Sequence, residues 1–187
     1  DSITHKQLLS DDHSVAILYT SGSTGKAKGV VLSHRNIVLG AKSVSSYLKN
    51  TSDDKILTVL PFSFDYGLNQ LSSAFFVGAT IVLIDYLLPS DILRAVIKYH
   101  ITGLAGVPSL WIQLASLSWD KNNSLRYITN SGGTLPIEIL NRLKQALPDT
   151  NIYLMYGLTE AFRSTYVPPE ALDSHQSSIG IAIPHAQ

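Results

Sequence analysis

The chain has 187 residues, 45% hydrophobic and 15% charged, so it is long enough for one domain and too apolar to be disordered. Its 14 basic and 14 acidic residues cancel, so it lacks the positive excess of a nucleic-acid-binding protein. The absence of cysteine excludes disulfides, thiolate zinc sites and a cysteine nucleophile, and it fits a reducing, cytoplasmic compartment. No apolar run approaches the ~20 residues of a membrane-spanning helix.

Short apolar segments alternate with amphipathic segments of helical length. Strands are predicted at residues 15–19, 29–32, 56–60, 81–84, 104–107, 126–129 and 152–155, the first of them buried. Helices are predicted after the cap Ser33, from about Tyr66 to Val77, from Pro89, from Ser109 to Leu117, and from Pro136. Residues 168–169 and 174–178 are predicted to be loop. This alternation predicts an α/β fold, with a largely parallel sheet flanked by helices and ligands at the carboxyl ends of the strands.

Three loops are expected at those strand ends: residues 20–28, 130–134 and 156–160. The first contains glycines, hydroxyl residues and lysines. Glycines let backbone N–H groups approach a phosphate, hydroxyls donate hydrogen bonds and lysine supplies charge. The loop is not a Walker A motif, because two residues separate Gly22 from Gly25 and Ala27 follows Lys26. A flexible linker is the alternative, but the strands on both sides favour a polyphosphate site.

The first loop resembles the phosphate-binding signature of the AMP-forming adenylating enzymes. This superfamily contains acyl-CoA synthetases, the adenylation domains of peptide synthetases, and luciferases. Residues 20–25 and 28–29 match the signature, and Ala27 replaces its usual proline. Residues 131–136 resemble the family's loop along the adenine and acyl pocket, and residues 156–160 resemble its Tyr-Gly-X-Thr-Glu motif. Three motifs in the family's order make the resemblance specific, and it extends over about residues 14–184.

The resemblance implies a role for each matching residue. The residues that would contact the phosphates are Thr20, Ser21, Gly22, Ser23, Thr24, Gly25 and Lys28. Adenine and acyl contacts fall to Gly132, Gly133 and Thr134, and Tyr156 with Gly157 would pack on the adenine. Thr159 would contact the α-phosphate and Glu160 would hold Mg²⁺, which makes Lys28, Thr159 and Glu160 the implied catalytic residues. Without the other motifs, Tyr156 and Glu160 would be interpreted as a core tyrosine and a solvated carboxylate.

The activity implied by the resemblance is ATP-dependent conversion of a small carboxylic acid to an acyl-adenylate. A thiol, either coenzyme A or the phosphopantetheine of a carrier protein, would then take the acyl group. Such chemistry needs charge neutralisation and alignment rather than a protein nucleophile. Three alternatives stay open: ATP hydrolysis or phosphoryl transfer, a noncatalytic nucleotide-binding or interaction module, and an amino-acid-adenylating domain.

The resemblance also implies that residues 1–187 are the nucleotide-binding core of a larger ligase. Family members have a further N-terminal part, an aspartate that binds the ribose, and a C-terminal lid domain with a lysine that promotes adenylate formation. The chain contains none of these, so we expect it not to turn over by itself.

Residues 61–67 stand where the family places a gate beside the acyl pocket, so Phe64, Asp65 and Gly133 would border the acid. In peptide-synthetase adenylation domains, an aspartate at the position of Asp65 pairs with the substrate amino group. The favoured alternative is that Asp65 caps a helix starting near Tyr66. Arg163 either closes the pocket electrostatically or forms a structural ion pair. The sequence of residues 66–166 resembles that of the acyl-CoA ligases associated with exosortase systems.

Overall fold

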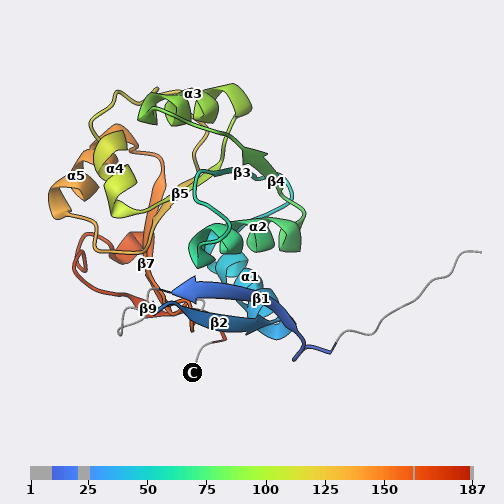
Figure 1. Cartoon of the computed structure of the whole chain (residues 1–187). Coiled ribbons are helices and arrows are strands. Elements are labelled where there is room, and N and C mark those ends of the chain that lie inside the picture. Colours follow the sequence, from blue (N-terminus) through green and yellow to red (C-terminus); the bar gives the residue numbers. More distant parts are fainter. Residues whose placement is uncertain (1–9, 21–25, 162, 186–187) are drawn as a thin grey trace, which may run out of the picture.

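The computed structural model of the chain describes residues 10–20, 26–161 and 163–185 (Figure 1). The strands are β1 (Ser14–Thr20), β2 (Lys28–Ser33), β3 (Lys55–Thr58), β4 (Thr80–Leu83), β5 (Gly103–Gly106), β6 (Tyr127–Asn130), β7 (Asn151–Tyr156), β8 (Thr165–Val167) and β9 (Ile181–Ala182). The helices are α1 (His34–Leu48), α2 (Asp65–Val77), α3 (Pro89–Tyr99), α4 (Pro108–Leu114) and α5 (Ile137–Ala146), with a 3₁₀ turn η1 (Pro169–Ala171).

The main sheet has, within the described residues, seven strands in the order β4-β3-β5-β6-β7-β8-β9. Neighbouring strands from β4 to β7 pair in parallel, whereas β8 is antiparallel to both β7 and β9. The prediction of an α/β fold with a largely parallel sheet flanked by helices is confirmed.

Helices cover both faces of this sheet (Figure 1). Successive strand residues point to opposite faces, so Leu104 and Ile128 pack under α3, α4 and α5, whereas Ala105 and Tyr127 pack against α1 and α2. Burial on both faces explains why these strands are short apolar runs without polar alternation.

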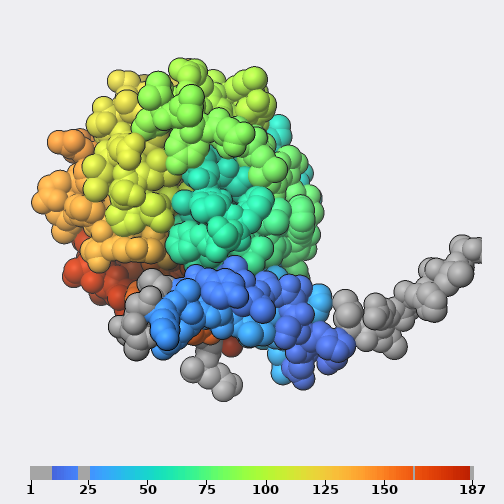
Figure 2. Space-filling model, in the orientation of Figure 1, coloured from blue at the N-terminus to red at the C-terminus, as the bar shows by residue number. Residues whose placement is uncertain are grey.

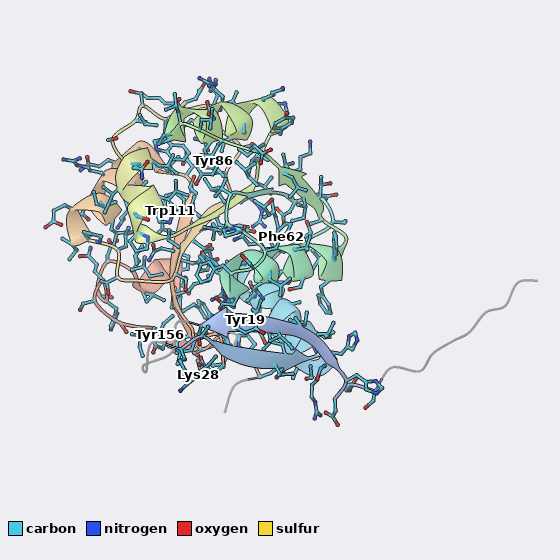
Figure 3. The ribbon with its side chains drawn as sticks, viewed as in Figure 1. Tyr19, Lys28, Phe62, Tyr86, Trp111 and Tyr156 are labelled. Carbon is cyan, nitrogen blue, oxygen red and sulfur yellow. The ribbon has the colours of Figure 1, made fainter. Side chains whose placement is uncertain are left out.

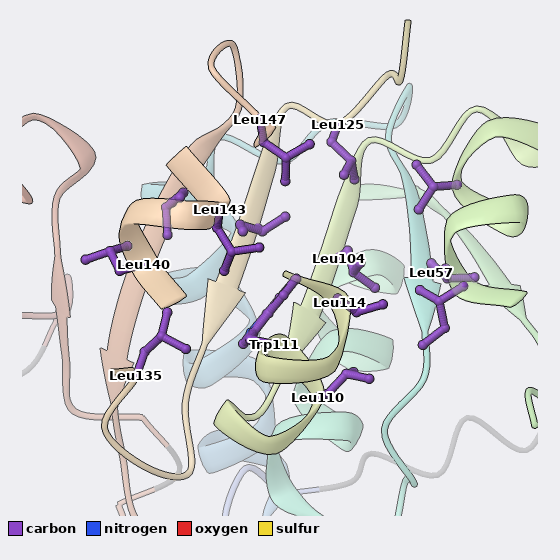
Figure 4. Packing of buried hydrophobic residues seen from close by; sticks show 14 of the residues in the cluster. Leu57, Leu104, Leu110, Trp111, Leu114, Leu125, Leu135, Leu140, Leu143 and Leu147 are labelled. Atoms are coloured by element: carbon purple, nitrogen blue, oxygen red, sulfur yellow. The ribbon is translucent and has the colours of Figure 1, made fainter. Parts of the chain in front are cut away.

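Trp111 of α4 occupies the centre of the larger cluster and is fully buried (Figure 4). Its indole N–H donates a hydrogen bond to the carbonyl oxygen of Thr129 in β6, at 3.1 Å. Gly106 lies directly beneath the ring, where a Cβ would stand 2.8 Å from a ring carbon. A glycine at the end of β5 therefore lets α4 approach the sheet closely.

Strands β1 and β2 form an antiparallel hairpin that is a separate two-stranded sheet. Figure 2 shows the hairpin, in blue, along the lower edge of the molecule. In β1 only Leu18 is buried, while Val15, Ile17 and Tyr19 are exposed. The prediction of a buried first strand is thus wrong, and the phosphate-type loop does not follow a strand of the main sheet as expected. The apolar residues of β1 had suggested a central strand, but they belong to a ribbon with one open face.

The remaining predictions match with small shifts. Ser33 caps α1 as predicted, because its hydroxyl accepts a hydrogen bond from the backbone N–H of Asn36 at 3.3 Å. The predicted strand at 56–60 ends at Thr58, and the predicted helix at 109–117 is α4, which ends at Leu114. Strands β8 and β9 were not predicted, since three and two residues are too short to show a period. Among the described residues, none of the helices has the length and apolarity needed to cross a membrane.

A buried carboxylate, Asp54, ties together the edge of the sheet where the strands begin. It accepts hydrogen bonds from Arg126 Nε at 3.0 Å and Nη2 at 2.7 Å, which is a side-on, two-pronged ion pair. The Thr102 hydroxyl, the Thr51 backbone N–H and the Asn50 side-chain amide also donate to it, at 2.6, 2.9 and 3.2 Å. These contacts join the segments that precede β3, β5 and β6.

The hydrogen bonds decide the ionisation of Asp54. Burial by itself would raise the pKa of its carboxyl group, but the bonds from Arg126, Thr102, Thr51 and Asn50 outweigh burial and lower that pKa below 3.8. A carboxylate with a lowered pKa in the folded state stabilises the fold above its unfolded-state pKa, and the contribution is lost as the pH falls through the folded-state pKa.

We therefore expect Asp54→Asn to destabilise the protein by about 2 kcal/mol at pH 7, below the roughly 3–5 kcal/mol of a fully buried pair because Arg126 is partly exposed. Urea unfolding midpoints measure this loss, with the exposed neighbour Asp53→Asn as the control. The difference in urea unfolding midpoint between the wild type and Asp54→Asn should decrease as the pH falls below about 4. Equal midpoints for the two variants at pH 7 would contradict this role.

Candidate functional site

A cavity of about 270 Å³ lies where the loops after β6 and β7 meet the start of α2 and the end of β1. Its lining residues are Thr20, Phe64, Asp65, Ser131, Gly132, Gly157, Leu158, Thr159, Glu160 and Arg163. One lining residue comes from the first predicted motif, two come from the loop after β6, and four come from the motif after β7. The structure thus brings together residues that are far apart in the sequence.

A second cavity, of about 390 Å³, adjoins the first and shares Gly132, Gly157 and Leu158 with it. It is lined in addition by Asn130, Gly133, Thr134, Leu135, Leu154, Met155, Tyr156 and residues 176–179. Tyr156 stands at the end of β7 with 43% of its surface exposed, so its ring is available to a flat ligand. The sequence had marked residues 174–178 only as loop, and nothing in their composition pointed to this cavity wall.

The glycine loop after β6 has a fixed shape. The side-chain amide of Asn130 donates a hydrogen bond to the Gly133 carbonyl oxygen at 3.0 Å. Gly132 has φ +79°, in the left-handed region that favours glycine, and a Cβ on Gly133 would stand 3.2 Å from Pro108. Thr134, like both glycines, is exposed. This loop therefore presents backbone rather than bulky side chains to both cavities.

The segment after β7 turns back toward the sheet. The Ala161 N–H donates to the Leu158 carbonyl oxygen at 3.1 Å, and the Ser164 N–H donates to the Tyr156 carbonyl oxygen at 3.2 Å. Thr159 is half-buried and Glu160 exposed, both on the wall of the smaller cavity. At Gly157 a Cβ would lie 3.2 Å from Arg163 Nη1 and 3.3 Å from its Cα. A side chain at this position would require the two arms of the turn to move slightly apart.

The hairpin brings the ends of the first motif together, because Thr20 and Lys28 are directly paired in the register of β1 and β2. Thr20 lines the smaller cavity. Lys28 is exposed, and Figure 3 shows it on the same side of the molecule as Tyr156. Ser21, Gly22, Ser23, Thr24 and Gly25 lie outside the described residues.

Asp65 corrects the helix-cap prediction. The cap residue of α2 is Phe64, which makes no side-chain capping hydrogen bond, and Asp65 is the first helical residue. Asp65 is buried instead, with its Oδ2 3.7 Å from Nη1 of Arg163. The ion pair that the sequence left open for Arg163 is therefore formed within the cavity wall, between residues whose proximity no local pattern predicts.

Tyr66 packs behind this wall and contacts Arg163 without lining the cavity itself. Its ring lies under the guanidinium of Arg163, with 4.5 Å from the Arg163 Cζ to the ring centre. Its hydroxyl is hydrogen-bonded to that of Thr129, and burial raises the pKa of Tyr66, so the phenol stays neutral. The sequence predicts only that a helix starts near Tyr66, since an isolated tyrosine carries no signal for such a contact.

Comparison with known proteins gives consistent matches. A family model described as AMP-binding enzyme matches residues 2–187. The chain is 35% identical over 166 residues to 4-coumarate–CoA ligase-like 9 of Arabidopsis thaliana, which covers 83% of this chain and 29% of that protein.

Two solved structures resemble the fold closely. VinN in complex with L-aspartate has a TM-score of 0.86 at 30% identity, covering 94% of this chain and 45% of VinN. o-Succinylbenzoate CoA synthetase (MenE) from Bacillus subtilis, in complex with ATP and magnesium ion, has a TM-score of 0.85 at 27% identity, covering 94% and 37%. The chain spans less than half the length of each of these proteins.

Replacing Asp65 by Asn separates the ion pair from the helix cap. Asn caps a helix about as well as Asp, so a capping Asp65 would tolerate the change. In the ion pair, Asp65→Asn leaves the buried Arg163 charge without its acidic partner, and we expect a loss of about 1–3 kcal/mol in urea unfolding. An unchanged unfolding midpoint would favour the cap.

Proposed function

Because the chain belongs to the AMP-binding enzyme family, we propose that its site activates a carboxylic acid with ATP. A carboxylate oxygen attacks the α-phosphorus, the bond from that phosphorus to the β-phosphate oxygen breaks, and pyrophosphate leaves with the acyl-adenylate remaining. The observation that carries this proposal is the smaller cavity, where Thr20, Gly132 and Thr159 bring the three motifs to one place. None of the steps needs a nucleophile from the protein.

The two cavities suggest a division of the nucleotide. The larger one offers the exposed ring of Tyr156 and the backbone of Gly132 and Gly133, which suit a stacked adenine. The smaller one offers the Thr20 and Thr159 hydroxyls, which suit phosphate oxygens. Residues 21–25 and Lys28 would complete the phosphate site, and Phe64, Asp65 and Gly133 would border the acid.

The exposed carboxylate of Glu160 is a suitable ligand for Mg²⁺. Its carboxylate is an exposed hard-oxygen donor on the cavity wall, and the described residues form no cluster of three or more metal-ligating side chains. Mg²⁺ in nucleotide sites commonly takes one or two carboxylates and the substrate phosphates. Bound there, Mg²⁺ would neutralise phosphate charge, and Glu160 would position it.

The second half-reaction would transfer the acyl group from the adenylate to a thiol, with AMP as the leaving group. A CoA ligase-like relative and the CoA synthetase MenE support coenzyme A as the acceptor, and MenE bound to ATP and magnesium supports both of these ligands. A carrier-protein phosphopantetheine is the alternative acceptor. The small share of each relative that the chain covers supports the proposal that residues 1–187 are the nucleotide-binding core of a larger ligase.

Lys28 provides a test of the phosphate site in the complete protein. Lys28→Ala removes a charge-assisted contact, so acid-dependent exchange of labelled pyrophosphate into ATP should fall about 10- to 100-fold. Lys26→Ala is the matched control, because Lys26 occupies the free position of the motif and is also exposed. Equal exchange rates in the two variants would remove Lys28 from the site. Formation of ADP and phosphate, in place of AMP and pyrophosphate, would refute adenylation itself.

Tyr156 provides a test of the adenine site. Stacking of a base on an aromatic ring contributes roughly 1–3 kcal/mol, so Tyr156→Ala should raise the KM for ATP about 5- to 100-fold. The KM for the acid should change less, because the ring lines the larger cavity and not the smaller one. Tyr99→Ala, at the end of α3, is the control. An unchanged KM for ATP would place the adenine elsewhere.

A further inference from the structure

Arg163 is a buried cation whose hydrogen-bonding capacity is only partly used. Its side chain is 2% exposed, Nη1 faces Asp65, and its Cζ stands over the ring of Tyr66, 4.5 Å from the ring centre. Its Nε and Nη2 are also buried and donate no hydrogen bond within the part of the chain that the structure describes. These two nitrogens form one edge of the guanidinium, so a whole side of a buried charge lacks a partner.

The ion pair of Arg126 shows which kind of acceptor binds the Nε and Nη2 atoms of an arginine. The same two atoms, Nε and Nη2, donate to the two oxygens of Asp54 at 3.0 and 2.7 Å. The two N–H groups are parallel and match the spacing of carboxylate oxygens. Leaving them without acceptors in a buried position costs free energy, so an unused edge calls for an explanation.

The position of Arg163 indicates where the missing acceptor comes from. Arg163 lines the smaller cavity together with Phe64, Asp65 and Gly132, on the wall proposed to border the acid. It also lines a cavity beside α1 and Pro184, but its ion-pair partner Asp65 lines only the smaller cavity described above. In the proposed reaction the carboxylate that is activated lies at the α-phosphate beside Thr159, which leaves the Arg163 edge for another acceptor. The acceptor therefore belongs to a second group of the same molecule.

We propose that Arg163 binds a second carboxylate of the acid, so that the substrate class is a dicarboxylic acid; this rests on the proposed adenylation. Asp65 holds Nη1 and Tyr66 supports the guanidinium face, which together fix the free edge before the substrate arrives. An amino group on the acid would further balance the negative charge of Asp65. The other possible source of an anion is a phosphate of ATP.

The experiment compares acids of equal chain length in the complete protein: succinate with butyrate, glutarate with pentanoate, and adipate with hexanoate. Acid-dependent pyrophosphate exchange gives kcat/KM for each. We expect at least one dicarboxylate to exceed its partner by about 10- to 100-fold in the wild type. Arg163→Gln should bring that ratio close to one, and Arg163→Lys should give an intermediate ratio because lysine lacks the two-pronged edge. Arg142→Gln, an exposed arginine on α5, should keep the wild-type ratio.

Because each ratio compares two acids in the same variant, loss of folded protein cancels. A wild type without preference for any dicarboxylate would overturn the inference and leave adenylation standing, as would a ratio unchanged in Arg163→Gln. A raised KM for ATP with an unchanged ratio would assign the edge to a phosphate. Absence of exchange with every acid, including the aspartate and glutamate that should also be tried, would refute the proposed function. A thermal shift by the preferred dicarboxylate and not by its partner, without ATP, would then decide the role of Arg163 separately.

Discussion

Parallel pairing of β3, β5, β6 and β7 is the constraint on which the site depends. Parallel strands end at one edge of a sheet, so the loops that follow them converge whatever their sequence separation. Helices on both faces remove the strands from water, which leaves that edge as the place where backbone and polar side chains meet solvent. At the opposite edge, Asp54 accepts five hydrogen bonds from three segments, which fix the starts of β3, β5 and β6.

Among the described residues, two ion pairs contain a buried carboxylate, and they differ in how completely their hydrogen-bonding groups are used. Asp54 and Arg126 engage both oxygens and both nitrogens of one edge, as expected of a pair that stabilises the fold. Asp65 and Arg163 are separated by 3.7 Å and leave two guanidinium nitrogens unused within the described residues. The Asp54–Arg126 pair has its hydrogen bonds already in the folded chain. The Asp65–Arg163 pair, in contrast, would gain hydrogen bonds when an acceptor enters the cavity.

The sequence predicted the main sheet well, because its central strands are short apolar runs between helices with a clear period. It failed for the hairpin, where Val15, Ile17 and Tyr19 have the composition of a buried strand but form an open ribbon. It also missed β8 and β9, which exist only through pairing with β7 and with each other. Local composition cannot distinguish these cases, since they are decided by what lies opposite in space.

For the candidate site, too, some residues could be predicted from local sequence and others could not. Gly132, Gly157, Thr159 and Glu160 belong to motifs that can be recognised one segment at a time, and the structure places all four on one cavity wall. The contact of Arg163 with Asp65 and Tyr66 joins α2 to the turn after β7, so no single segment shows it. The helix-cap interpretation of Asp65 failed for this reason: it considered only the neighbours in sequence.

The close approach of Gly157 to Arg163 links nucleotide binding with selectivity for the acid. Its backbone belongs to the motif proposed to hold the nucleotide, yet a Cβ there would press on Nη1 and Cα of Arg163, the residue proposed to read the acid. A side chain introduced at position 157 would therefore displace Arg163 through direct contact. Redesign of acid selectivity in this scaffold must keep glycine at position 157, or vary it together with Arg163, because the turn from Gly157 to Arg163 behaves as one unit.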